Sequence, residues 1–402
     1  MTVLFVPPSE GQARLQGLLY EGREHIAIDW REQLDAFVRA SDRLLNLLEG
    51  VMPEIACIVD AETLTDLHSA VSGRAQSGAG ARGAVPSGCA SALARSALAG
   101  ERWDGVVWYS PTIFFGPLVR ALKRRCGCRA YLILRDLFPD WAVDAGVMRR
   151  GLAYRFFKRV ERYQYRRADV IGVQTPANVP LVERTLAGRG ARPRIEVLNN
   201  WQSASLRRRA SVDPEATALA GRTLFAYTGN MGAAQDMDGL LDLAERLRAR
   251  RDIGFLFVGR GSEAARLRAR ADADRLDNVL FLDEIDSAEV PALLERCQVG
   301  LIALDPRHTT HNIPGKLLTY LRAGLPVLAR INPGNDLEAL IEREDVGRVC
   351  VGDDPERLQR HAEELASDAA LRAAMSVRCR ALAEREFSSA AAATQVVHGL
   401  AA

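Results

Sequence analysis

The stretch that decides the fold runs from His311 to Ala329 and reads HNIPGKLLTYLRAGLPVLA. This pattern predicts a polar loop, a helix opened by Pro314, a glycine stop at Gly324 and a short buried strand after it. The start of such a helix has unpaired N–H groups and the positive end of the helix dipole, so it can bind an anion. Lys316 adds a full charge in the first turn, where a cation otherwise opposes the dipole. Because it is one of only three lysines among 53 basic residues, it indicates a phosphate site, with a solvated surface lysine as the alternative.

Composition is that of an ordinary globular protein. The chain has 402 residues, 48% hydrophobic residues and a formal net charge of +2, which suffices for two domains and indicates neither nucleic-acid binding nor disorder. No apolar run approaches the roughly 20 residues that span a bilayer. The start of the chain, Met1–Val6, predicts a strand and not a signal peptide. Seven irregularly spaced cysteines fit neither a disulfide framework nor a zinc site, which favours a reducing cytoplasm.

Strand-like runs alternate with helical patterns along most of the chain, which predicts parallel α/β sheets. We expect two Rossmann-like, doubly wound domains, at residues 1–203 and 204–385, that face a cleft at the carboxyl ends of their strands. Residues 386–402 predict a C-terminal helix that packs back on the first domain. The expected strands are Val3–Val6, Ile55–Val59, Gly105–Tyr109, Ala130–Leu134, Val170–Gln174, Arg194–Leu198, Thr223–Thr228, Ile253–Val258, Val279–Leu282, Val299–Leu304, Pro326–Ala329 and Arg348–Val351.

Three loops of the second half follow strands that end at this cleft. Tyr227–Gln235 (YTGNMGAAQ) is a glycine-rich turn in which Asn230 and Gln235 offer amides to phosphate or sugar hydroxyls. Val258–Ala264 (VGRGSEA) fits G-x-G-x-x-A and is also compatible with a dinucleotide fingerprint. The third loop leads into the helix of Lys316. Each could be an ordinary strand-to-helix turn, but three loops on one side favour a ligand site.

The first half offers a second group of candidates. Val6–Gly11 follows the first strand, and Leu134–Asp144 (LRDLFPDWAVD) follows the fourth. In the latter loop, Arg135 and Asp136 stand at the end of a buried strand, which predicts an acceptor loop or reaction centre. A structural Arg–Asp pair is an equally good interpretation.

The segment Arg149–Arg167 has eight basic residues interleaved with aromatic and aliphatic ones and a single acid. Such a helix can lie on an anionic membrane surface, and a core helix with a solvated basic face is the alternative. The residues expected to meet the membrane are Arg155, Lys158, Arg159 and Arg162.

Several motifs together resemble a known family. YTGNMGAAQ, FVGRGSE (Phe257–Glu263), NVLFL (Asn278–Leu282) and NIPGKLLTYLRAGLPVLA (Asn312–Ala329) occur in the order seen in bacterial glycosyltransferases of family four, also called group one. Leu134–Gly146 and Ala168–Thr175 resemble a subgroup that builds O-antigen and capsule and includes transferases of N-acetylated 6-deoxyhexosamines such as fucosamine. The resemblance spans nearly the whole chain and is weakest over residues 12–100.

The resemblance implies the two-domain glycosyltransferase B-type fold. A nucleotide-diphosphate sugar, UDP-linked, would bind the second domain, and a polyprenyl-diphosphate-linked saccharide would bind the first. The enzyme would need no metal and no cofactor, and would retain the anomeric configuration. It would be cytoplasmic and peripheral on the inner face of the bacterial plasma membrane. Its expected partners would then be the donor, the acceptor and the anionic lipid of that membrane.

The resemblance also implies roles for single residues. Lys316 would neutralise the departing diphosphate, with Arg135 and Asp136 as further catalytic candidates. The donor-binding candidates are Gly11, Gly229, Asn230, Gly232, Gln235, Gly259, Arg260, Glu284, Ile285, His311, Asn312, Ile313, Pro314, Gly315 and Thr319. The acceptor-side candidates are Ser9, Asp140 and Trp141.

The chain departs from the family pattern at several of these positions. Many members have two glutamates in an E-x7-E arrangement where this chain has His311 and Thr319, and a histidine where it has Arg135. Other hypotheses are a sugar-nucleotide epimerase on the same fold, a non-catalytic nucleotide-binding scaffold, and an NAD-dependent oxidoreductase that uses the Gly259–Ala264 match.

Overall fold

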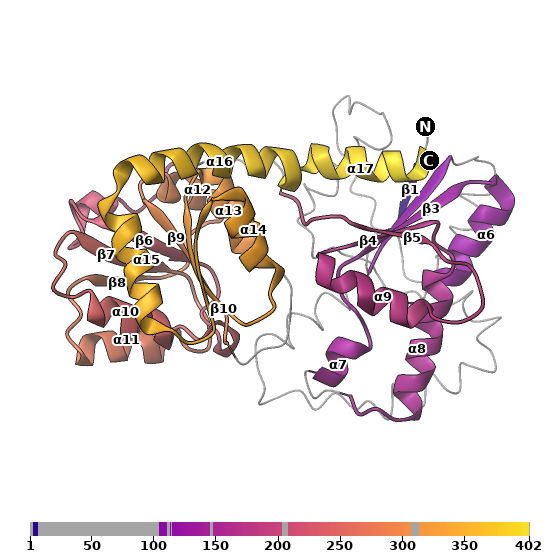
Figure 1. The fold of residues 1–402 in the computed structure, drawn as a ribbon, viewed down its shortest axis with the longest axis horizontal. Helices are drawn as coiled ribbons and strands as arrows, with labels where there is room; N and C mark the ends of the chain where they lie inside the picture. The colour runs from indigo at the N-terminus through magenta and orange to yellow at the C-terminus, as the bar shows by residue number, and fades with distance from the viewer. Residues whose placement is uncertain are drawn as a thin grey trace. The chain divides into compact units, whose positions relative to one another are not determined.

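The computed structural model describes residues 3–6, 104–110, 113, 115–144, 148–202, 208–306 and 313–401. The chain divides into two α/β units, of which the first comprises residues 1–198 and 392–402 and the second residues 199–391 (Figure 1). Several sequence-based expectations lie outside the described residues: the strand Ile55–Val59, the loop Val6–Gly11 beyond Val6, and the site candidates Ser9, Gly11, His311 and Asn312.

Unit 1 contains a parallel sheet whose described strands follow the order of the chain. The continuous apolar runs of its inner strands are buried on both faces, which is typical of a parallel sheet. Its strands are β1 (Val3–Val6), β2 (Gly105–Tyr109), β3 (Arg129–Leu134), β4 (Val170–Val173) and β5 (Arg194–Val197). Its described helices before the C-terminus are α6 (Gly116–Cys126), α7 (Asp140–Asp144), α8 (Leu152–Tyr165), the short 3-10 helix η1 (Pro176–Asn178) and α9 (Val179–Leu186).

Helices α6 and α8 pack closely in unit 1. A Cβ atom on Gly116, the first residue of α6, would lie only 2.7 Å from the ring of Tyr163 on α8, so this contact requires a glycine. The side chain of Gln164 accepts a hydrogen bond of 2.9 Å from the backbone N–H of Phe115. The two helices therefore hold a fixed position relative to each other.

The C-terminal part of the chain returns to unit 1. Helix α16 (Ala369–Phe387) is followed by α17 (Ser389–Ala401), and the side chain of Gln395 donates to Glu196 Oε1 at 3.0 Å and to the carbonyl of Val197 at 2.7 Å. Further along α17, Gly399 lies against the ring of Tyr131. The end of α17 thus covers strands of unit 1.

Unit 2 contains a six-stranded, fully parallel sheet in the order β11-β10-β9-β6-β7-β8. The strands are β6 (Thr223–Thr228), β7 (Ile253–Val258), β8 (Val279–Leu282), β9 (Val299–Ala303), β10 (Val327–Ile331) and β11 (Gly347–Val351). They differ from the expected strands only at their ends. The strand order reverses between β6 and β9, and ligands of open α/β sheets bind at the carboxyl edge at such a point.

The helices of unit 2 form two layers, one on each face of this sheet (Figure 1). Along β7, Leu256 and Val258 belong to one core cluster while Phe255 and Phe257 belong to the other, as the strand period of two requires. The remaining elements are η2 (Pro214–Ala216), η3 (Ala233–Gln235), α10 (Asp238–Arg246), α11 (Ala264–Ala273), α12 (Val290–Leu294), α13 (Gly315–Ala323), α14 (Asp336–Glu344) and α15 (Pro355–Ser367).

Candidate functional site

Helix α13 has the predicted start and end. Pro314 is its N-cap residue, with φ −64° and ψ 138°, and Gly324 ends it in the left-handed conformation with φ 73°. Its apolar face is buried, and Ile313 and Leu317 lie in the same core cluster. Around Gly315, the first helical residue, a Cβ atom would meet no atom within 4 Å. The space on the Cβ side of Gly315, in the first turn of the helix, is therefore open.

Tyr320 holds this helix start in place relative to the sheet. Its hydroxyl accepts a hydrogen bond of 3.1 Å from the backbone N–H of Thr228 at the end of β6. Its ring lies against Gly300 in β9, where a Cβ atom would be 2.5 Å away. The sequence pattern around Tyr320 does not single it out; the available signal was Gly300, a glycine inside a buried strand, which often marks a close approach by another group.

Lys316 points from α13 to the loop that follows β6. Its Nζ atom lies 4.7 Å from the centroid of the Tyr227 ring, and a Cβ atom on Gly229 would be 3.5 Å from the same Nζ. Within the described ranges, no carboxylate forms an ion pair with it. Burial lowers the pKa of Lys316 from 10.5 to about 8. The ammonium is thus a partly desolvated cation with no counter-charge among the described residues, and an anion would stabilise it.

The loop after β6 is ordered by its own hydrogen bonds. The Tyr227 hydroxyl donates to the carbonyl of Asn230 at 2.5 Å, and the side-chain oxygen of Gln235 accepts from the N–H of Gly232 at 2.9 Å. The side-chain oxygen of Gln235 is therefore used inside the loop. Gly229 and Asn230 are exposed, so this part of the loop remains accessible beside Lys316.

The glycines of the second loop have a structural role. Gly259 and Gly261 have φ angles of 145° and 152°, and Cβ atoms there would clash with the carbonyl groups of Gly229 and Met231. Met231 N–H donates to the carbonyl of Arg260 at 2.7 Å. The contact between the loops after β6 and β7 therefore accounts for both glycines without a dinucleotide.

Two donor-site candidates of neighbouring loops form an ion pair. Arg260 Nε, after β7, lies 3.1 Å from Glu284 Oε2, after β8, and both side chains are exposed. Ile285 packs against the core, and Thr319 is half-buried on α13. The structure thus places Gly229, Asn230, Gly232, Gln235, Gly259, Arg260, Glu284, Ile285, Ile313, Pro314, Gly315, Lys316 and Thr319 on α13 and on the loops after β6, β7 and β8.

Arg330, at the end of β10, is a second functional candidate that the sequence motifs do not include. Its guanidinium donates to Asp236 at 2.7 Å and to Asp353 at 2.9 Å, while Asp236 has a left-handed φ of 42°. This pair of ion pairs ties the loop after β6 to the loop after β11. No local sequence pattern predicts these ion pairs, because the partners are far apart in the sequence.

In unit 1, Arg135 is buried and 7% exposed. Its guanidinium donates to the carbonyl of Leu198 at 2.5 Å, and its backbone N–H donates to Ser110 Oγ at 2.7 Å. Burial lowers the pKa of Arg135 from its ordinary value. Arg135 therefore connects the ends of β2, β3 and β5. Asp136 is half-buried beside it.

Asp140 and Trp141 lie on α7, and Asp140 is held by two side chains of α8. Asp140 accepts from the Tyr154 hydroxyl at 2.6 Å and from Lys158 Nζ at 2.9 Å. The ring of Trp141 lies 6.1 Å from that of Phe138. The acceptor-side loop and α8 are consequently one packed assembly.

The four expected membrane residues on α8 do not share one environment. Arg155, Arg159 and Arg162 are exposed, next to a Leu152 side chain that is 84% exposed. Lys158 instead faces inward, with a 16% exposed side chain, because Asp140 and Glu161 pair with it. We call Leu152, Arg155, Arg159 and Arg162 the outer stripe, and Lys158 is not part of it.

The described residues include no group of three His, Cys, Asp or Glu side chains that could hold a metal ion. In the same part of the chain, no helix has both the length and the apolar character needed to span a bilayer.

Comparison with known proteins identifies the class. Residues 222–368 match the family model described as glycosyl transferases group 1. The matched segment contains β6 to β11 and the Lys316 site. The resemblance to group one glycosyltransferases is therefore confirmed, and this segment is a domain of that family.

Two curated relatives are similar to this chain at low identity. "Probable glycosyltransferase WbjE" of Pseudomonas aeruginosa is 24% identical over 253 residues, which are 61% of each chain. "Putative colanic acid biosynthesis glycosyl transferase WcaI" of Escherichia coli K12 is 24% identical over 276 residues, 65% of this chain and 66% of the relative. The match thus spans less than two thirds of the length of either relative.

Similar solved structures agree on the fold. HepE of Anabaena, solved in complex with UDP, has a TM-score of 0.58 at 14% identity and covers 77% of this chain and 81% of its own. Sucrose-phosphate synthase of Thermosynechococcus elongatus has a TM-score of 0.54 at 15% identity, with coverages of 86% and 80%. The predicted α/β fold with parallel Rossmann-like sheets, of the glycosyltransferase B type, is confirmed.

Proposed function

We propose that this chain is a retaining, metal-independent hexosyltransferase that moves a sugar from a UDP-sugar to a polyprenyl-diphosphate-linked saccharide during synthesis of O-antigen or capsule. The group 1 match and the two relatives named as glycosyltransferases, one of them for colanic acid biosynthesis, support the reaction class. Structures of HepE with UDP and with UDP-glucose support a UDP-linked donor. The donor sugar that we propose is an N-acetylated 6-deoxyhexosamine.

The observation that carries this proposal is the position of Lys316. Its ammonium lies beside the side-chain-free Gly229 and in the first turn of α13. A diphosphate placed there would accept hydrogen bonds from the first N–H groups of the helix and would pair with the ammonium. The open space around Gly315 allows such a group to reach the backbone.

Charge develops at this position during the proposed reaction. The bond between the anomeric carbon and the diphosphate oxygen breaks, and its electron pair leaves with UDP. The acceptor hydroxyl attacks the face from which UDP departs, which retains the configuration, and its proton passes to the departing diphosphate. Lys316 would stabilise the negative charge of the leaving group, and groups that stabilise developing charge make large contributions to catalysis.

The acceptor side is assigned to unit 1. Asp136, half-buried at the carboxyl end of β3, is the proposed catalytic group there. We propose that the outer stripe of α8 contacts the anionic inner surface of the plasma membrane. Basic residues near such a surface and a protruding apolar side chain both favour binding.

One experiment separates this function from its alternatives. Calorimetry with UDP, GDP and NAD tests which nucleotide binds, and incubation with UDP-sugars followed by product analysis tests the reaction. A transferase releases UDP in the presence of an acceptor or water. Conversion of the intact sugar nucleotide to an epimer would indicate an epimerase, UDP binding without turnover a scaffold, and selective NAD binding an oxidoreductase.

A further inference from the structure

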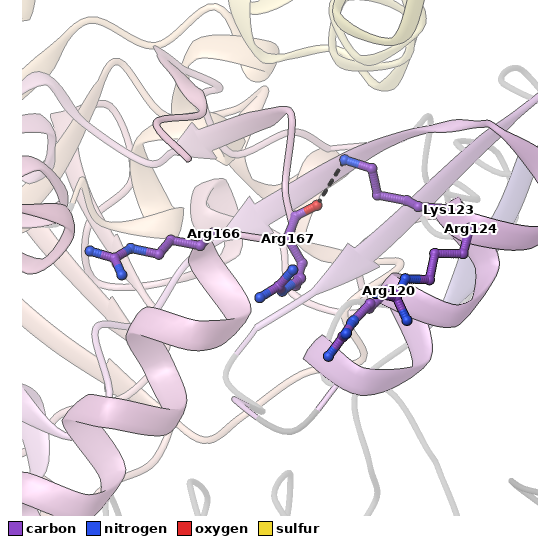
Figure 2. Close-up of a pocket in the computed structure, with 5 residues that line it drawn as sticks. All are labelled: Arg120, Lys123, Arg124, Arg166 and Arg167. Carbon is purple, nitrogen blue, oxygen red and sulfur yellow. Dashed lines mark hydrogen bonds between the residues drawn. The ribbon is translucent and has the colours of Figure 1, made fainter. Parts of the chain in front are cut away.

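The described residues that line a cavity of about 270 Å³ in unit 1 are all basic. Three of them project from α6 and two directly follow α8: Arg120, Lys123, Arg124, Arg166 and Arg167 (Figure 2). Helix α6 ends just before β3 begins, and Arg167 stands just before β4. The cavity therefore lies at the amino edge of the sheet, whereas Arg135 and Asp136 follow the carboxyl end of β3.

Among the residues that the structure describes, one carboxylate pairs with these charges. Asp169 pairs with Lys123 Nζ at 2.7 Å and also accepts the N–H of Ala130 at 2.8 Å. Lys123 donates in addition to the carbonyl of Arg167 at 3.2 Å, as Figure 2 shows. Across the ranges that the structure describes, the four arginines form no ion pair, and the buried Nε atoms of Arg166 and Arg167 have no hydrogen-bond partner.

The walls of the cavity are held in place by specific contacts. The guanidinium of Arg167 lies over the ring of Tyr163, 4.5 Å from its centroid. Arg166 packs against Gly190, where a Cβ atom would lie 2.9 Å from its Cζ. Arg120 and Arg124 are one helical turn apart on α6 and so share one face, and α6 is itself locked to α8. The like charges are therefore kept together although they repel each other.

We propose that this basic pocket is a binding site for the phosphate group of an anionic ligand. Guanidinium groups match phosphate oxygens in geometry, and pairing would offset both the repulsion and the missing hydrogen bonds. The cavity is smaller than the roughly 300–1,000 Å³ of sites for drug-sized ligands, which suits a phosphate or a headgroup. The phosphate can belong to a soluble molecule or to a lipid, because Arg166 follows Arg162 of the outer stripe by one helical turn.

The first arm of the test uses a soluble anion. Binding of inorganic pyrophosphate is measured by calorimetry in the presence of saturating UDP, so that the site in unit 2 is occupied. The pocket variant Arg120→Ala/Arg124→Ala is compared with the control Arg155→Ala/Arg159→Ala, which loses the same charge from exposed positions of the same unit. For a soluble ligand, the pocket variant binds at least about tenfold more weakly, while the control binds like wild type.

The second arm uses vesicles of phosphatidylglycerol and of phosphatidic acid, with phosphatidylcholine as the neutral reference. For a lipid headgroup, the pocket variant loses sedimentation with the anionic vesicles beyond the loss of the control, and its pyrophosphate binding is unchanged. Circular dichroism and thermal melting confirm that both variants are folded. The proposal is overturned when the pocket variant matches the control in both arms, or when wild type binds neither probe. Neither variant changes a residue of the donor site in unit 2. The proposal for the basic pocket and the proposal for the donor site can therefore be refuted independently of each other.

Discussion

The ammonium of Lys316 lies over the ring of Tyr227, with 4.7 Å between Nζ and the ring centroid. An aromatic ring attracts a cation by about 0.5–2 kcal/mol and leaves its charge intact. A carboxylate at the same place would neutralise the charge and hold the side chain away from other anions. The contact thus orients a cation at the start of α13 and keeps it available for a phosphate.

The first prediction concerns turnover. Lys316→Met keeps most of the aliphatic side chain and removes the charge, so transfer should slow by on the order of 10²–10³ because the leaving group loses its counter-charge. The matched control is Arg248→Ala, which removes a charge from an exposed position of the same unit. A loss in kcat/KM of less than about tenfold for Lys316→Met would show that Lys316 does not stabilise the leaving group.

The same substitution should stabilise the fold. The pKa of Lys316 is lowered to about 8 in the folded chain, so the protonated form is less favourable there than in the unfolded chain. Stability should therefore rise with pH between about 8 and about 10.5 in wild type. At neutral pH, Lys316→Met should melt at a higher temperature than wild type, since it removes a buried charge. A lower melting temperature would show that the ammonium is structural.

Alanine substitutions at Gly315 and Gly259 should have opposite effects on stability. Gly315→Ala should leave the fold as stable or more stable, because alanine favours a helix by up to about 1 kcal/mol and its Cβ meets nothing. UDP should nevertheless bind more weakly, since the Cβ enters the space reserved for the diphosphate. Gly259→Ala should instead lower the melting temperature, because its φ is 145° and the Gly229 carbonyl blocks the Cβ. Unchanged UDP affinity in Gly315→Ala would show that the start of α13 is not part of the donor site.

Local sequence patterns predicted the secondary structure of the described residues better than their long-range contacts. The apolar runs located the described strands, and Pro314 and Gly324 located α13, because caps and buried runs act over a few neighbouring residues. Hydrogen bonds between residues distant in the sequence were not predicted. Tyr320 accepts one from Thr228, 92 positions away, and Arg330 donates one to an aspartate 94 positions away. Their pairing depends on strand order, which periodicity does not encode.

Lys158 illustrates the same limit on a helix. Basic and aromatic periodicity described α8 correctly as amphipathic, but the direction of one long side chain depends on its partners. Asp140 and Glu161 turn Lys158 inward. Likewise, the glycines of Val258–Ala264 match a dinucleotide-binding motif. In the structure they allow two loops to pack closely against each other.

The acceptor side can be tested separately from the donor side. Asp136→Ala should lower kcat and leave the affinity for UDP nearly unchanged, because Asp136 belongs to unit 1 and the donor site to unit 2. Calorimetry and initial rates with a polyprenyl-diphosphate-linked acceptor measure the two effects. A large loss of UDP affinity would assign this loop to the donor.

The outer stripe makes a prediction about membranes. Arg155→Ala/Arg159→Ala should weaken binding to anionic vesicles, at about 1 kcal/mol per basic residue near the surface, and salt should weaken wild-type binding. Lys158→Met is the contrast: it should leave vesicle binding intact and lower the melting temperature, because Glu161 is buried and would lose its cation. Equal loss of vesicle binding in both variants would contradict the inward position of Lys158.

The central claim is that Lys316 receives the diphosphate of the donor, and calorimetric titration of UDP across pH tests it most directly. Lys316 should be charged below a pKa of about 8. Wild-type affinity should therefore be nearly constant from about pH 7 to 8 and fall by up to about tenfold per unit above it, as the ammonium loses its proton. Lys316→Met should bind UDP more weakly at pH 7 and show no such fall. Wild-type and Lys316→Met curves of equal height and slope would contradict the account.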